Sequence, residues 1–503
     1  MEKQFRELLA KMNAYSSAIK LMAWDLRTGA PKKGVPARAQ ALGMLSTEVF
    51  LLSTSDLMET CLCDLEKMDK HESLDEIMKA SVKECRRNID RVRRIPKELY
   101  REFATLTAEA ESVWEEAKNR NDFAMFRPWL EKIVGMTKQM IGHLGYEKHP
   151  YDALLEDFEP GMTVEKLDPL FAEMRARLVP LLARIKSSPQ PSTIDLETRC
   201  FDPEKQKAFS LKVLERMGYD FQAGRLDASE HPFTIGITSG DVRITTHYDP
   251  HDVKSALFGS IHEGGHGLYE QNIDPILLDT PLHTGSSMGV HESQSRFWEN
   301  MVGHSQSFWI SMYGELCSYF PEQLNDVSSE DFYRTINQVS PSLIRVEADE
   351  LTYNLHIMIR YEIEKALLTD QIGVSDLPRV WNEKMQEYLG LTPPDDKSGV
   401  LQDVHWAGGG FGYFPSYALG NLYSAQILQA MKKDIPDFED RLRRGELLEI
   451  KDWLVEKIHR FGKLKSPGEL LRDITGREMD SRCLLDYLEN KYAAIYPVKE
   501  SCK

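Results

Sequence analysis

Apolar residues recur with the 3.6-residue spacing of an α-helix through most of this chain, and few prolines interrupt the pattern. A segment with that spacing buries one stripe of its surface as a helix, whereas a half-buried strand would alternate apolar and polar residues. The helical pattern covers residues 1–24, 34–53, 74–94, 97–118, 123–144, 163–187, 203–217, 250–271, 290–318, 330–338, 341–369, 375–389, 416–434 and most of 436–494. We therefore expect a mostly α protein.

Strand patterning is scarce, and its clearest case is residues 231–249, where β-branched and aromatic residues surround the turn Ser239-Gly240. This composition predicts a hairpin, and hence one small sheet directly before the helix expected over 250–271. No internal repeat, low-complexity linker or charge block divides the chain. We expect a single domain over residues 1–503, with an N-terminal helical part to about residue 200 and a part from about 201 that carries the functional site.

The net charge of the chain is −17, and no dense basic run breaks the acidic background. Nucleic acid and anionic membranes are therefore poor partners. The N-terminus leads into an amphipathic helix without an apolar signal core, and no apolar run is long enough to span a bilayer. The seven cysteines are odd in number and scattered, as expected for reduced thiols. We expect a soluble, cytoplasmic protein.

The helix expected over 250–271 contains three glycines in four positions, although each costs about 1 kcal/mol relative to alanine inside a helix. Asp249-Pro250 supply a capping side chain and a first-turn proline, and Asp252 is well placed for the helix dipole. The core stripe of this helix comprises Val253, Leu257, Ile261 and Leu268. A helical wheel places Gly264 in that stripe, where a neighbouring element can pack closely, and Gly265 beside the groove, where a side chain would narrow it. Gly267 has no assignable role.

His262 and His266 stand four residues apart, so one face of this helix presents both imidazoles away from the core stripe. In the His-Glu-x-x-His pattern two imidazole nitrogens bind Zn²⁺, and the glutamate, here Glu263, takes a proton from metal-bound water. The alternative is a pair of surface histidines on an ordinary helix.

A third metal ligand should lie downstream of the two histidines. Glu292, in His291-Glu292-Ser293-Gln294, lies 26 positions after His266 and opens the next long helix. A two-His, one-Glu set leaves the fourth position of zinc open, which is typical of catalytic sites. Glu270 and Glu299 are the alternative carboxylates.

Five motifs resemble those of the M32 metallocarboxypeptidases, also called the carboxypeptidase Taq family, and the resemblance spans nearly the whole chain. In chain order the motifs are Asp241-Val242-Arg243-Ile244-Thr245, His262-Glu263-Gly264-Gly265-His266, His291-Glu292-Ser293-Gln294, Ile344-Arg345-Val346-Glu347-Ala348-Asp349 and Gly399-Val400-Leu401-Gln402-Asp403-Val404-His405-Trp406.

This resemblance implies a mostly helical, saddle-shaped, cytoplasmic homodimer with a deep groove. It also implies the removal of single amino acids from peptide C-termini with broad specificity. The metal of the family is usually zinc, and cobalt (Co²⁺) supports activity in some members.

Three side chains near the last motif are candidates to stabilise the tetrahedral oxyanion, by similarity to related metallopeptidases: His405, Tyr413 and Tyr417. The alternative for the tyrosines is that they are packed aromatics of a core segment. His231, just before the predicted hairpin, is a candidate to hydrogen-bond the substrate backbone, and the alternative is a structural turn histidine.

An exopeptidase must also bind a free carboxylate, for which the guanidinium fork of arginine is suited. Arg345 and Arg243 both lie in motifs, and we favour Arg345. The alternatives are an i,i+4 ion pair between Arg345 and Asp349 on a helix, and a contact of Arg243 with a neighbouring acid. Arg296 and Asp349 are further candidates to orient metal ligands.

Two other functions compete with a metallocarboxypeptidase. A dipeptidyl carboxypeptidase or an endopeptidase would keep the same metal chemistry. The residue that binds the substrate carboxylate would lie farther from the metal, or would be absent. A non-enzymatic, metal-dependent binding protein would not need Glu263.

Overall fold

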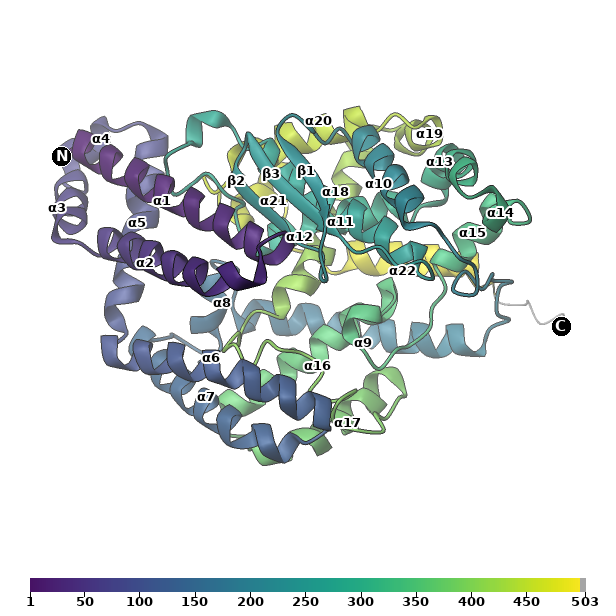
Figure 1. Cartoon of the computed structure of the whole chain (residues 1–503), viewed down its shortest axis with the longest axis horizontal. Coiled ribbons are helices and arrows are strands. Elements are labelled where there is room, and N and C mark those ends of the chain that lie inside the picture. Colours follow the sequence, from purple (N-terminus) through teal and green to yellow (C-terminus); the bar gives the residue numbers. More distant parts are fainter. Residues whose placement is uncertain (498–503) are drawn as a thin grey trace. The chain divides into compact units, whose positions relative to one another are not determined.

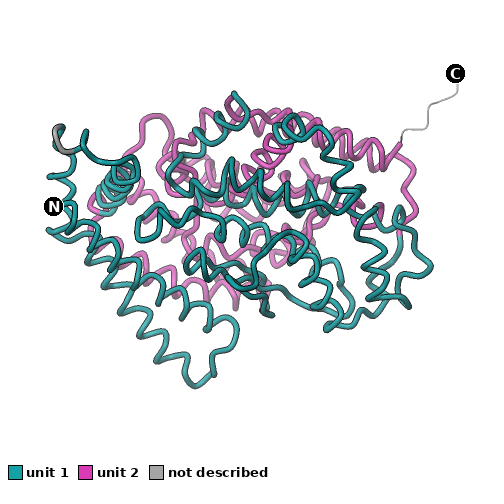
Figure 2. The backbone as a smooth tube through the Cα atoms, turned by 90° about the horizontal axis from the view of Figure 1, so that it is seen from above, with its two compact units in different colours: residues 1–92, 194–333, 430–476 teal, residues 93–193, 334–429, 477–503 magenta. Residues whose placement is uncertain are grey.

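A computed structural model describes residues 1–497, and of residues 69 and 70 only the backbone. The chain forms two compact units, each assembled from three separate segments (Figure 2). Unit 1 contains residues 1–92, 194–333 and 430–476, and unit 2 contains residues 93–193, 334–429 and the segment from 477. The single domain inferred from the sequence stays a prediction. Six cysteines of the described part are free thiols, and Cys502 lies outside the described residues.

Unit 1 is a helical assembly with one small sheet (Figure 1). Its helices are α1 (Glu2–Thr28), α2 (Val35–Ser53), α3 (Asp56–Leu65), α4 (Met68–Ser73), α10 (Pro203–Met217), α11 (Val253–Gln271), α12 (Met288–Arg296), α13 (Gln306–Tyr319), α14 (Pro321–Leu324), α19 (Phe438–Arg444), α20 (Leu448–Lys457) and α21 (Pro467–Thr475). Three more helices contain residues of both units: α5 (Glu76–Arg94), α15 (Ser329–Ile336) and α18 (Pro415–Asp434).

The sheet has three strands in the order β1-β3-β2: β1 (Gly224–Ala228), β2 (Thr234–Thr238) and β3 (Asp241–Thr246). Strands β2 and β3 are antiparallel around Ser239-Gly240, which confirms the predicted hairpin. Strand β1 pairs in parallel with β3 and was not predicted, because its sequence lacks β-branched residues. Strand β2 is therefore an edge strand of this sheet.

Helix α11 begins at Val253, three residues later than its sequence pattern predicts. Its N-cap is Asp252, whose carboxylate accepts a hydrogen bond from the Ser255 amide (3.0 Å). The predicted cap, Asp249, instead accepts a hydrogen bond from the His251 amide (2.8 Å) in the preceding turn. The prediction of Asp249 as the cap is therefore wrong, because its side chain stabilises a turn that delays the helix.

Two glycines of α11 lie where other elements approach the helix. A Cβ atom on Gly264 would lie 2.4 Å from Leu214 Cδ2 of α10, which confirms that this glycine permits close packing. A Cβ atom on Gly267, for which the sequence suggested no role, would lie 2.8 Å from Tyr219 Cε2. Both glycines make room for side chains that hold α11 in place.

Gly265 has a different role from the one predicted. A Cβ atom there would lie 2.5 Å from the Gln294 carbonyl oxygen and 2.7 Å from Ser295 Cα, both in the backbone of α12. The prediction that Gly265 lies beside an open groove is therefore wrong, because the position is filled by a second helix. This close contact brings α11 and α12 together.

Helix α1 is held inside unit 1 at both of its ends. Its first turns contribute Phe5, Leu8 and Leu9 to a hydrophobic cluster with residues of α3 and α5. Near its other end the buried Trp24 packs against Phe233, which precedes β2, with ring centroids 5.3 Å apart. Helix α2 runs beside α1 (Figure 1).

The regular elements of unit 2 are all helices within its described residues, 93–193, 334–429 and 477–497. Its helices are α6 (Lys97–Arg120), α7 (Phe123–Leu144), α8 (Asp152–Phe158), α9 (Val164–Ser187), α16 (Glu350–Leu368), α17 (Leu377–Leu389) and α22 (Arg482–Ile495). Helix α16 packs against α7, α9 and α17, and most of its residues are buried, including Arg360 and Glu364.

The sequence pattern over 341–369 predicts the start of α16 nine residues too early. Asp349 is the N-cap, and its carboxylate accepts hydrogen bonds from the Leu351 and Thr352 amides (3.1 and 2.9 Å). The segment before it contains only the 3₁₀ turn Arg345–Glu347. Asp349 therefore has a capping role, which was not predicted, and its role in orienting metal ligands stays a prediction.

The helix predicted over 290–318 is interrupted. Helix α12 passes into the π-helical turn Phe297–Gly303, and α13 starts after Ser305, whose hydroxyl oxygen accepts a hydrogen bond from the Phe308 amide (3.2 Å). Helices α3, α4, α8 and α14 lie outside the predicted ranges. Even so, a mostly α fold with one small sheet before α11 is confirmed. None of the helices within residues 1–497 is both long and apolar enough to cross a membrane.

Candidate metal centre

Helix α11 lies against the sheet and against α12 (Figure 1), and it carries both histidines of the sequence motif. The four residues of its predicted core stripe are all buried. His262 and His266 face away from that stripe, and their side chains are 18% and 15% exposed. The helix therefore presents both imidazoles as its sequence spacing predicts.

The structure brings the three predicted metal ligands together. One ligand atom from each of His262, His266 and Glu292 lies within 4.8 Å of the other two. Glu292 Oε2 lies 3.7 Å from His262 Nε2 and 3.4 Å from His266 Nε2. Two imidazole nitrogens and one carboxylate oxygen are the donor set of catalytic zinc sites with an open position. These residues therefore fit a divalent metal ion.

Glu299, one of the alternative ligands, supports a ligand instead of replacing it. Its Oε2 lies 2.8 Å from His262 Nδ1, the nitrogen that does not face Glu292. Arg296 donates to Glu292 Oε1 (2.7 Å) and to Glu299 Oε2 (3.1 Å). Arg296 thus holds two carboxylates of the site, in agreement with its predicted orienting role.

The two carboxylates bound by Arg296 are ionised at neutral pH. Burial by itself would raise the pKa of Glu292, but Arg296 and His262 hold that pKa well below its ordinary value. Burial also opposes ionisation of Glu299, yet Arg296 and the hydrogen bond with His262 lower its pKa to about 2. The site therefore offers negative charge to a cation.

Glu263 is buried beside the edge strand of the sheet. Its Oε2 accepts a hydrogen bond from the Thr234 hydroxyl of β2 (2.6 Å), and its side chain is 7% exposed. The second carboxylate oxygen retains lone pairs that can accept a proton. Thr234 was not singled out from the sequence, because only the packing of β2 on α11 brings it to Glu263.

In unit 2 the structure groups Arg345 with acidic and aromatic side chains. Its Nε and Nη2 donate to Asp403 Oδ1 (3.0 and 2.9 Å), and its Nη1 donates to the Tyr353 hydroxyl (3.0 Å). The alternative ion pair between Arg345 and Asp349 is therefore wrong, because Asp349 caps α16. Arg360, fully buried, donates to Asp403 Oδ2 (2.7 Å), so two guanidinium groups share one carboxylate.

The structure also brings the three predicted oxyanion candidates together in unit 2. His405 Nε2 lies 3.3 Å from the Tyr417 hydroxyl, and the Tyr413 and Tyr417 rings are 5.2 Å apart. The Arg345 guanidinium lies over the Tyr417 ring at 5.0 Å. Burial, followed by the nearby arginines, lowers the pKa of His405 to about 4 even though Asp403 opposes this shift. His405 is therefore neutral at pH 7.

A buried carboxylate on α16 anchors the segment that carries these side chains. Glu364 accepts hydrogen bonds from the Tyr151 hydroxyl (2.5 Å), the Trp406 indole (2.8 Å) and the Gly412 amide (3.0 Å). Burial raises the pKa of Glu364 to about 7. Trp406 and Gly412 flank the glycine-rich stretch 408–410, so Glu364 fixes the loop between His405 and α18.

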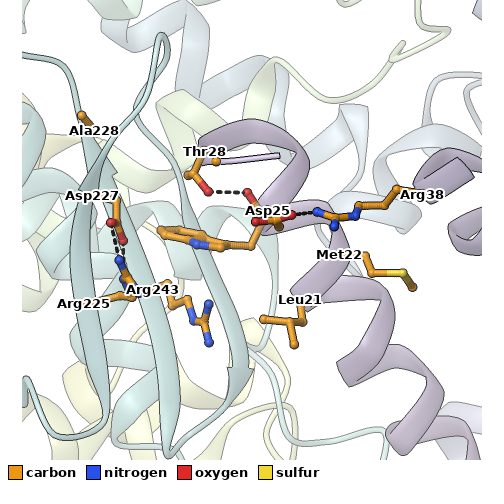
Figure 3. Close-up of a pocket in the computed structure, with 11 residues that line it drawn as sticks. Leu21, Met22, Asp25, Thr28, Arg38, Arg225, Asp227, Ala228 and Arg243 are labelled. Atoms are coloured by element: carbon orange, nitrogen blue, oxygen red, sulfur yellow. Dashed lines mark hydrogen bonds and ion pairs between the residues drawn. The ribbon is translucent and has the colours of Figure 1, made fainter. Parts of the chain in front are cut away.

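Arg243 lies on the face of the sheet that points away from α11. Its neighbours on β3 are buried toward α11, so strand alternation turns Arg243 to the other face. There it donates to both oxygens of Asp241 (2.7 and 2.8 Å), as the alternative interpretation predicts. It also lines a cavity of about 570 Å³ together with Trp24 of α1 (Figure 3). His231 is exposed just before β2.

A model of the carboxypeptidase Taq (M32) metallopeptidases matches residues 4–492. Carboxypeptidase 1 of Bacillus subtilis is 49% identical over 495 residues, which cover 98% of this chain and 98% of the relative. Thermostable carboxypeptidase 1 of Thermus thermophilus is 43% identical over 486 residues, 95% of each chain. The crystal structure of an M32 carboxypeptidase from Deinococcus radiodurans matches with a TM-score of 0.95 at 37% identity and covers 99% of both chains.

A helical fold with a two-His, one-Glu cluster and a glutamate next to the first histidine defines a metallopeptidase. The relatives make the class more specific, because the two curated relatives given above are named carboxypeptidases. The chain belongs to the carboxypeptidase Taq (M32) family and is a metallocarboxypeptidase, a peptide hydrolase. The alternative of a non-enzymatic binding protein does not agree with this membership.

Proposed function

We propose that the protein is a zinc-dependent carboxypeptidase that releases single amino acids from peptide C-termini with broad specificity. The observation that carries the proposal is the convergence of His262, His266 and Glu292 beside Glu263. The choice of zinc follows from the mixed nitrogen and oxygen donors, and Co²⁺ is expected to substitute for it. The proposal also includes a cytoplasmic homodimer, for which family membership is the support.

The chemistry divides between the ion and the side chains of the chain. When bound, zinc acts as a Lewis acid that polarises the scissile carbonyl and acidifies water. Glu263 accepts the proton of the attacking water and returns it to the leaving amine. The Thr234 hydroxyl, which donates to one oxygen of Glu263, keeps that carboxylate oriented while the other oxygen accepts the proton.

Arg345 is the proposed anchor for the substrate carboxylate. A guanidinium carries five N–H groups, and Asp403 and Tyr353 accept three of those of Arg345 in the described part of the chain. Two N–H groups are left for a carboxylate. Because Arg345 and Arg360 share the single charge of Asp403, this buried group has a surplus positive charge that favours an anion. Arg243 is not proposed as this anchor, because it lies on the face of the sheet that points away from α11.

His405, Tyr413 and Tyr417 are the proposed donors to the oxyanion that develops during hydrolysis. Neutral His405 offers one N–H, and each tyrosine offers a hydroxyl, so none of them must lose a proton to act. The proximity of Arg345 to Tyr417 links this group to the carboxylate anchor. His231, near the start of β2, remains a candidate contact for the substrate backbone.

Cleavage of a mixed-sequence peptide, followed by mass spectrometry, tests the proposal. We expect a ladder that shortens by one residue at a time, that stops with a chelator and that resumes with added zinc. A C-terminally amidated copy of the same peptide is the matched control, and it should resist cleavage because it lacks the carboxylate. Steps of two residues would instead indicate a dipeptidyl carboxypeptidase, and internal cuts or cleavage of the amide would indicate an endopeptidase.

A further inference from the structure

His266 is supported in a different way from His262. His262 Nδ1 is 2.8 Å from a carboxylate, that of Glu299. His266 Nδ1 is instead 2.6 Å from His291 Nδ1, and His291 Nε2 is 2.9 Å from Glu270 Oε1. A second histidine therefore stands between this metal ligand and its carboxylate.

The hydrogen positions in the series His266, His291 and Glu270 follow from the chemistry of its last member, Glu270. The ionised carboxylate of Glu270 only accepts hydrogen bonds, so His291 must carry its proton on Nε2. In that tautomer the Nδ1 of His291 has a lone pair and accepts a hydrogen bond. The facing Nδ1 of His266 must donate, and this leaves the lone pair of His266 Nε2 directed at Glu292 and the metal position.

Glu270 is itself fixed by the edge strand β2. A Cβ atom on Gly236 would lie 2.4 Å from Glu270 Oε2, so glycine at this position leaves room for the carboxylate where it lies. Lys20 of α1 donates to the Gly236 carbonyl (2.6 Å), which ties α1 to the same strand. Glu270 is 7% exposed, and its second oxygen is thus confined between α11 and β2.

We propose that His291 and Glu270 are positioning residues that fix the Nδ1–H tautomer and the ring orientation of His266. This inference rests on the proposed metal site. Its consequence is that zinc affinity depends on an acceptor atom at the place of His291 Nδ1, and not on the bulk or the ring of that side chain. Substitution of residues that orient a metal ligand commonly lowers metal affinity by roughly 10- to 100-fold.

Two substitutions at position 291 distinguish the effect of the hydrogen-bond acceptor from the effect of the aromatic ring. His291→Phe keeps a planar ring but removes the acceptor, whereas His291→Asn keeps an oxygen near the place of Nδ1. The matched control is His247→Phe, because His247 is another half-buried histidine of unit 1 and its Nδ1 pairs with the Ser229 carbonyl oxygen. Zinc dissociation constants are measured by competition with a chromophoric chelator, and the melting temperature of each metal-free variant is measured in parallel.

We expect His291→Phe to weaken zinc binding roughly 10- to 100-fold, and His291→Asn to recover most of that loss. The control should bind zinc like the parent protein. If His291→Phe fails to fold, the double variant His291→Phe/Glu270→Gln removes the buried charge and is expected to show the same loss of affinity. Parental zinc affinity in His291→Phe or in the double variant, or no recovery in His291→Asn, overturns the inference. Failure of the parent protein to bind zinc would overturn the proposed function itself.

Discussion

Replacement of Gly265 by alanine would test whether the contact between α11 and α12 holds the metal centre together. The new methyl group would lie 2.5 Å from the Gln294 carbonyl oxygen and 2.7 Å from Ser295 Cα, and both atoms belong to the backbone of α12. Overpacking of this kind costs about 1–3 kcal/mol. Alanine in place of glycine inside a helix contributes about 1 kcal/mol in the opposite direction. We expect the free energy of unfolding to fall by up to about 2 kcal/mol.

The same substitution should weaken metal binding. Helix α12 carries Glu292, so a shift of this helix away from α11 also moves a carboxylate ligand away from the two histidines. Ligands displaced by a fraction of an ångström bind their metal less well, and we expect a loss of about tenfold in zinc affinity.

Two other glycines provide matched controls. Alanine at Gly264 would meet Leu214 and Met217, whose side chains can rotate, so we expect a smaller loss of stability and unchanged zinc affinity. Gly314, exposed on α13, has no described atom within 4 Å of an added Cβ, and alanine there should stabilise the protein by about 0.5–1 kcal/mol. Urea unfolding of the metal-free proteins and zinc competition measure both effects. The reasoning is refuted if Gly265→Ala behaves like Gly314→Ala, or if Gly264→Ala loses more zinc affinity than Gly265→Ala.

Three further predictions concern Glu263 beside the metal ligands, and Arg345 and Glu364 in unit 2. Glu263→Gln should retain zinc by metal analysis while turnover falls roughly 100-fold or more, and retained turnover would remove Glu263 as the base. Arg345→Met should raise KM for free peptides and leave zinc content unchanged, and an unchanged KM would exclude the anchor. Burial raises the pKa of Glu364 to about 7 from an ordinary value near 4.5, so between these pH values the folded protein keeps a proton that the unfolded chain releases. The stability that results from protonation of Glu364 is complete below pH 4.5 and is lost as the pH rises to 7. Relative to Glu364→Gln, urea unfolding should show the parent protein losing up to about 3 kcal/mol across that window, and parallel profiles would contradict this assignment.

The sequence could predict those features that depend on local spacing. The separation of His262 and His266 by one helical turn places both on one face, whatever packs around the helix. The hairpin of β2 and β3 is equally local, since a Ser-Gly turn joins its strands. Strand β1 was missed because it joins the sheet by a parallel pairing, which short-range patterns do not reveal.

Predictions from local spacing failed where a distant residue offered a better partner. Arg345 and Asp349 have the spacing of a helical ion pair, but Asp349 satisfies the first amides of α16. Arg345 instead pairs with Asp403, which lies 58 residues away. With Asp349 at the N-cap, Arg345 precedes the first turn of α16, so the two residues do not share a helical face.

The residues that orient the metal ligands could not be predicted from local sequence patterns. Glu299 and His291 reach the two histidines only because α12 and the turn after it lie against α11, and that approach requires the missing side chain of Gly265. The glycines, which disfavour a helix, therefore determine which groups surround the metal position. A helix with alanine at these positions would form more readily alone, but it would keep its supporting residues too far away to orient the ligands.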